Sequence, residues 1–61
     1  GDIRLLSSKV VGKRGNIVLE IEGREEPPPG FADKIADQMK EEFGLEEVKV
    51  KIRFVPVLIS Q

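Results

Sequence analysis

The chain contains no cysteine, histidine, threonine, tyrosine or tryptophan, and these absences exclude several kinds of function. Without cysteine and histidine it lacks the residues that form disulfides and hold structural zinc. Its three serines, Ser7, Ser8 and Ser60, have no histidine to activate them as nucleophiles. The sequence therefore predicts a protein that is not an enzyme and that binds neither a metal nor a cofactor.

Charge of one sign and long apolar runs are missing as well. Ten basic and eleven acidic residues give a net charge of −1, so no overall field attracts nucleic acid or an anionic membrane. No apolar stretch approaches the roughly 18 residues of a membrane-spanning helix, and no signal peptide is recognisable. We therefore expect a soluble segment that does not itself insert into a membrane. Residue 1 is glycine rather than methionine, which indicates a domain excised from a larger protein.

A length of 61 residues allows a single domain, residues 1–61, with a thin core. Chains of this size bury only about 60% of the surface that their unfolded form exposes. Such small domains often gain the missing burial from a partner or from a second copy.

The strongest pattern that is present lies in residues 48–54, where apolar and basic residues alternate. A period of two places apolar and basic side chains on opposite faces of a strand. The apolar face consists of Val48, Val50, Ile52 and Phe54, and the basic face of Lys49, Lys51 and Arg53. This pattern predicts a sheet that is covered by a helix on one side and open to water on the other.

The other elements follow from local signals. Residues 3–11 are rich in branched side chains but break strict alternation, which predicts a strand with a bulge. Residues 12–16 contain glycine and asparagine and predict the turn of a hairpin, whose second strand spans residues 17–22. Three prolines make residues 23–30 a connector. Residues 31–43 show helical spacing of apolar side chains, and Gly44 stands where a helix usually closes.

These elements predict an α+β domain, a two-layer β-β-α-β(β) sandwich with one helix on a three- or four-stranded sheet. We favour the strand order 2-1-3, with the order 1-2-3 as the alternative. In the alternative, Glu20 and Glu22 lie beside the basic row of the last strand and form cross-strand pairs with it. The predicted core consists of Ile17, Leu19, Ile21, Ile35, Met39, Phe43, Val50, Ile52 and Phe54.

Two features suggest contacts with phosphate. The stretch Gly12-Lys13-Arg14-Gly15 resembles the Gly-x-x-Gly loop with which KH domains clamp a nucleic-acid backbone, but that loop joins two helices. Here a strand follows, so a hairpin turn is favoured. The basic row adds further candidates, giving Lys13, Arg14, Lys49, Lys51 and Arg53. Sheet faces that bind single strands interleave such residues with aromatic side chains, and all three phenylalanines here are assigned to the core.

A family resemblance rests on residues 16–57. Their order is a strand, Pro27-Pro28-Pro29, a helix that ends in Phe43-Gly44-Leu45, and a strand that runs from Val48 to Val57. This segment resembles the soluble tail of a family of uncharacterised microbial membrane proteins built around a conserved hydrophobic domain. It is also similar in layout to the β-β-α-β cytoplasmic domains of cation-efflux transporters, although their metal-binding histidines are missing here. The first resemblance implies an accessory domain of a membrane-anchored protein.

The sequence thus predicts a non-catalytic accessory or protein-interaction module, with a small nucleic-acid-binding domain as the alternative. Three consecutive apolar residues follow Pro56, namely Val57, Leu58 and Ile59. Because one helix cannot cover both faces of this short run, we expect it to be a fourth edge strand or an exposed tail. It is the predicted site of self-association or of contact with the parent protein.

Overall fold

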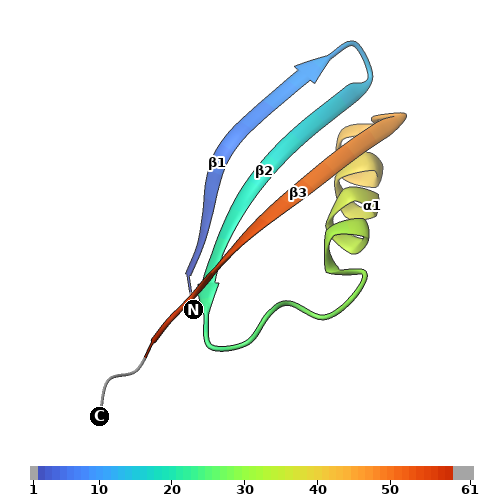
Figure 1. The fold of residues 1–61 in the computed structure, drawn as a ribbon. Coiled ribbons are helices and arrows are strands. Elements are labelled where there is room, and N and C mark those ends of the chain that lie inside the picture. The colour runs from blue at the N-terminus through green and yellow to red at the C-terminus, as the bar shows by residue number, and fades with distance from the viewer. Residues whose placement is uncertain (1, 59–61) are drawn as a thin grey trace.

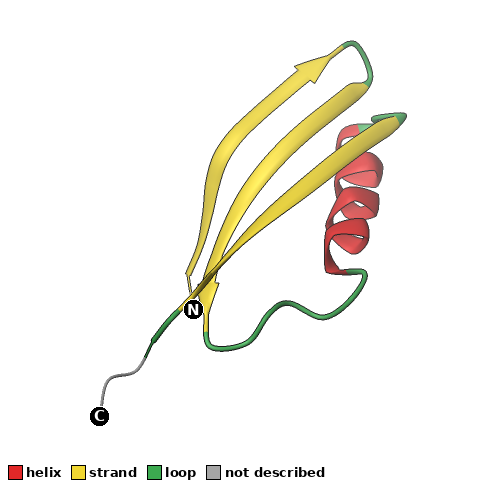
Figure 2. Cartoon of the chain, viewed as in Figure 1, coloured by secondary structure: helices red, strands yellow, loops and turns green. Residues whose placement is uncertain are grey.

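The computed structural model describes residues 2–58 and shows a three-stranded sheet with one helix on one of its faces (Figures 1 and 2). The chain order is β1 (Asp2–Val11), β2 (Arg14–Gly23), α1 (Phe31–Phe43) and β3 (Glu47–Pro56). This confirms the predicted α+β class and the β-β-α-β order. Strand β3 ends at Pro56, and neither Val57 nor Leu58 belongs to a strand. Residues 59–61 lie outside the described part of the chain.

The strand order is β1-β2-β3, so the favoured prediction of 2-1-3 is wrong and the alternative order is found. Strand β2 pairs with β1 antiparallel and with β3 parallel. Strand β2 suits the central place because Ile17, Leu19 and Ile21 alternate with other residues without a break. In this order α1 connects β2 and β3, which are neighbouring parallel strands. Strand β1 suits an edge because its pairing with β2 shifts register between Leu5 and Ser7, which is the predicted bulge.

The hairpin between β1 and β2 is tighter than predicted. Its turn consists of Gly12, whose φ is 59°, and Lys13, with Val11 and Arg14 already paired across the two strands. Residues 14–16 are extended because they also pair with the start of β3, where Arg14 lies opposite Glu47. The carbonyl oxygen of Lys13 accepts hydrogen bonds from the backbone N–H groups of Glu46 and Glu47, at 2.8 and 3.2 Å.

Helix α1 has the predicted bounds, and glycine occupies the position on either side of it. Gly30 and Gly44 both adopt left-handed conformations, with φ of 82° and 64°. After Gly44 the N–H of Leu45 donates to the carbonyl oxygen of Lys40 at 3.0 Å, which satisfies one of the last helical carbonyls. The helix therefore ends at a defined residue and turns the chain directly into β3.

Replacing Gly44 with alanine is expected to lower the free energy of unfolding by about 1–2 kcal/mol, because only glycine adopts φ near 64° without steric cost. A Cβ atom at Gly44 would have no heavy atom within 4 Å, so the loss would be conformational and not a clash. Gly23→Ala is the control, since Gly23 does not have positive φ and its Cβ would make only ordinary contact. Urea denaturation measures the free energy of unfolding of both variants. Equal losses would contradict the explanation by the left-handed conformation of Gly44.

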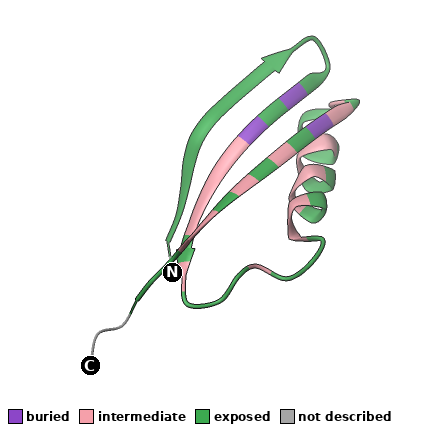
Figure 3. Cartoon of the chain, in the orientation of Figure 1, coloured by how far each residue is buried: buried purple, intermediate pink, exposed green. Residues whose placement is uncertain are grey.

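The core is thinner than the sequence predicts (Figure 3). Among residues 2–58 only Gly15, Ile17 and Val48 are buried. Seven further residues of the predicted core are half-buried, namely Leu19, Ile21, Ile35, Met39, Val50, Ile52 and Phe54. Phe43 was wrongly placed in the core, because 61% of it is exposed. It is the last helical residue, and the backbone of α1 approaches β3 and not the middle strand, so most of its ring stays in contact with solvent.

Candidate interaction surface

One half of the sheet carries apolar side chains that α1 does not cover. Cross-strand partners lie on the same face of a sheet, so pairing with Gly15, Leu19 and Ile21 of β2 places three β1 residues on the helix side. These residues are Ile3, Leu5 and Val10, and we call their surface the β1 face. Because the helix lies over β3, at the opposite edge of the sheet, nothing in the described chain covers the β1 face (Figure 1).

The exposure of the β1 face is large for aliphatic side chains. Ile3, Leu5 and Val10 are 64%, 57% and 60% exposed, whereas Ile17 on the same side of the neighbouring strand is 7% exposed. Every residue of β1 is exposed, and Figure 3 shows this strand in a single colour along its whole length. Covering aliphatic surface is the main favourable term in folding and association, so this face favours a partner.

A hollow extends the β1 face toward the end of α1. Its volume is about 360 Å³, and it lies where the hairpin, the start of β3 and the last turn of the helix meet. Most of its lining is apolar: it consists of Ser8, Val10, Gly15, Ile17, Met39, Phe43, Leu45 and Val48. Val10 belongs to both the β1 face and the hollow, so the two form one continuous surface.

The chain also exposes more surface than a compact monomer of its mass. A compact monomer of 6.8 kDa exposes about 3,950 Å², but this chain exposes 5075 Å², an excess of about 1,100 Å². The radius of gyration is 13.3 Å, compared with about 10.5 Å for a compact chain of this length. The β1 face contributes to this excess, together with exposed residues elsewhere such as Leu58.

The C-terminal residues that the sequence singles out lie at the other end of the molecule. Val57 is 39% exposed and its N–H donates to the carbonyl oxygen of Gly23 at 2.9 Å, while Leu58 is 90% exposed. Ile59 falls outside the described residues. This end of β3 is the one farther from the last turn of α1 (Figure 1), so the tail does not extend the β1 face into the hollow.

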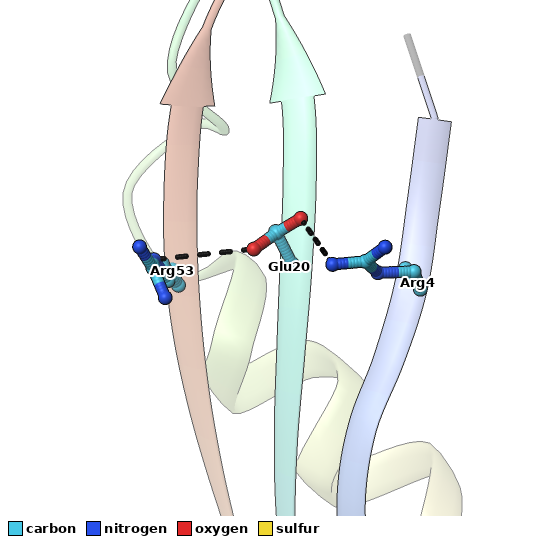
Figure 4. A network of polar contacts seen from close by, with 3 residues as sticks. All are labelled: Arg4, Glu20 and Arg53. Carbon is cyan, nitrogen blue, oxygen red and sulfur yellow. Dashed lines mark hydrogen bonds and ion pairs between the residues drawn. The ribbon is translucent and has the colours of Figure 1, made fainter.

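The opposite face of the sheet is polar and collects the predicted phosphate contacts. Arg14, Lys49, Lys51 and Arg53 lie there on β2 and β3, and Lys13 lies in the adjoining turn. Figure 4 shows Glu20 on this face between Arg4 and Arg53, with the helix behind the sheet. One carboxylate oxygen of Glu20 lies 3.1 Å from Nη2 of Arg4, and the other lies 3.9 Å from Nε of Arg53.

A second carboxylate repeats this arrangement near the hairpin. Glu47 lies 3.5 Å from Nε of Arg14 and 3.8 Å from Nζ of Lys49. Four of the basic side chains on this face thus have an acidic neighbour, which reduces the positive potential that a phosphate would meet. Aromatic side chains for base stacking are absent from this face, because Phe31, Phe43 and Phe54 lie on α1 and on the helix side of β3.

Neutralising Glu20 is expected to have a small effect on stability. Its two ion pairs involve arginines that are 71% exposed, and pairs of this kind contribute less than about 1 kcal/mol and weaken in salt. We expect Glu20→Gln to lower the melting temperature slightly at low salt and not at 1 M salt. The control is Glu22→Gln, because Glu22 lies on the same strand and makes no ion pair within residues 2–58. A large loss that persists in high salt would contradict this prediction.

Comparisons of the chain with family models, with curated proteins and with solved structures find no match. Within the described part, α1 is too short and too polar to cross a membrane. Residues 2–58 also bring together no group of three or more acidic side chains suited to hold a metal ion.

The sequence missed the β1 face because the bulge hides its pattern. Ile3 and Leu5 alternate correctly, but the extra residue near Leu6 shifts the period, so that Ser8 and Val10 continue the same face. A search for alternation that allowed one inserted residue would have joined the two halves of this face.

Proposed function

We propose that this chain is a non-catalytic protein-interaction module that self-associates, with a second copy of the chain covering the β1 face. The exposure of Ile3, Leu5 and Val10, at 57–64%, carries the proposal. The β1 face and the hollow beside it contribute part of the chain's excess surface of about 1,100 Å². A standard protein interface buries about 800 Å² per partner, so a second copy that covered this part would make an interface of ordinary size.

The aliphatic composition of the β1 face favours a protein partner over a nucleic acid. Ile3, Leu5 and Val10 are aliphatic and offer phosphate no donor or charge. The basic residues lie on the other side of the sheet, where Glu20 and Glu47 stand among them. A surface of this composition is best matched by another aliphatic surface.

Symmetry favours a second copy as the partner. In a dimer with two-fold symmetry the same patch meets itself, so one arrangement covers the β1 faces of both chains at once. Only the helix side carries this patch, and the charged opposite face opposes continued stacking. A closed dimer is therefore the expected assembly and an open fibre is not.

The family resemblance suggests where such a module would act. If the chain is the soluble tail of a membrane-anchored protein, as residues 16–57 imply, its dimerisation would hold two copies of that protein together. The module would then be an accessory domain that sets the spacing of its parent proteins and takes no part in chemistry.

Sedimentation equilibrium over a wide concentration range tests the proposal. We expect the mass to rise from 6.8 kDa toward twice that value as the concentration increases, with little dependence on salt. A folded chain that stays monomeric at millimolar concentration would overturn it. Binding of a labelled single-stranded oligonucleotide that weakens steeply with salt would support the alternative function instead.

A further inference from the structure

We infer, on the basis of the proposed self-association, that Phe43 of each copy inserts into the hollow of the other. The two parts of this contact lie side by side on one chain: an exposed aromatic side chain at the end of α1, and an apolar recess beside it. A patch in which a projection adjoins a matching recess can pair with itself about a two-fold axis.

Gly15 lies at the base of the recess and is buried. A Cβ atom built on it would lie 3.4 Å from Cδ1 of Leu45 and 3.8 Å from methyl groups of Val10 and Val48, so these side chains already surround this point. The recess has a volume of about 360 Å³, is partly open to solvent and has a mostly apolar lining. Walls of this kind offer water few hydrogen bonds, so an apolar side chain is the better occupant.

Phe43 is suited to be that occupant. It is 61% exposed although it borders the recess, so its own ring does not fill the space. The other two phenylalanines, Phe31 and Phe54, are half-buried against their own chain. Burial of an aromatic ring gives a large gain, and such residues commonly dominate the energy of an interface.

The competing contact is edge pairing, in which β1 of one copy would extend the sheet of the other. The bulge near Leu6 opposes this because it disrupts the row of backbone groups that a second strand would need. Edge pairing would also leave Phe43 and the hollow uncovered. The insertion of Phe43 would cover the exposed ring and the hollow in one contact.

The test uses Gly15→Val, which adds methyl groups at the base of the recess, and Phe43→Ala, which removes the projection. Gly15 does not have positive φ, so the backbone accepts valine, but its methyl groups would press against Leu45, Val10 and Val48. The stability of the dilute Gly15→Val chain is therefore measured beside its association. We expect Phe43→Ala to raise the dimer dissociation constant about thirtyfold and Gly15→Val to raise it at least about tenfold. Circular dichroism and Gly15→Ala, whose single methyl group makes only ordinary contacts, serve to check the fold.

The double variant separates this inference from the proposed function. If Phe43 enters the recess, Gly15→Val adds little to the loss already caused by Phe43→Ala, since both remove the same contact. Additive effects, or a dimer that neither change weakens, would overturn the insertion and leave self-association standing. A wild-type chain that is monomeric at every concentration would overturn both.

Discussion

Replacing Val10 with lysine is expected to dissociate the self-associated chain, whereas the same replacement at Val11 is expected to leave it intact. The two residues are neighbours on β1, with similar exposures of 60% and 64%, but strand alternation puts them on opposite sides of the sheet. Val10 belongs to the β1 face and to the hollow. Val11 lies opposite Arg14, on the polar face. Val10→Lys and Val11→Lys therefore differ mainly in the face of the sheet on which the lysine lies.

The expected size of the Val10→Lys effect follows from burial of a charge. An ammonium group held in an apolar interface without an acidic partner costs about 2–5 kcal/mol, which raises the dissociation constant at least about thirtyfold. Sedimentation equilibrium gives the dissociation constant of each variant. Melting in dilute solution should be the same for both, because each lysine would then be solvated. Equal loss of association in the two variants would show that the helix side is not the interface.

The parts of this fold that the sequence predicts well are those specified by local signals. The helix has its predicted bounds because spacing, a glycine before it and Gly44 after it all agree. The faces of β3 follow from uninterrupted alternation, and its basic residues lie opposite the helix as expected. Each of these features depends on residues close together in the chain.

The parts that the sequence did not predict depend on long-range arrangement. Both strand orders satisfied the alternation, and the one found places Glu20 between Arg4 and Arg53, a contact across three strands. Phe43 has helical spacing with Met39, yet it is exposed because α1 lies over the edge strand β3 and not over the middle of the sheet. Spacing tells which side of a helix is apolar, but the position of the helix on the sheet decides which of those residues are buried.

The thin core makes one further substitution decisive. Ile17→Ala is expected to lower the free energy of unfolding by about 2–5 kcal/mol, since Ile17 is 7% exposed and its truncation leaves a cavity. A domain of 61 residues has a total stability of about 3–9 kcal/mol, so this one change removes much of it. Urea denaturation of the dilute chain measures the loss.

Ile3→Ala is the matched control, because the same side chain is shortened on the same side of the sheet at a position that is 64% exposed. In dilute solution we expect its loss to stay below about 0.5 kcal/mol. At high concentration the wild type gains stability from association, and Ile3→Ala should lose part of that gain because its dimer buries less. The difference in the free energy of unfolding between Ile17→Ala and Ile3→Ala should thus become smaller as the protein concentration rises. Equal losses in dilute solution would mean that Ile3 is already covered within its own chain, and the β1 face would then have no need of a second copy.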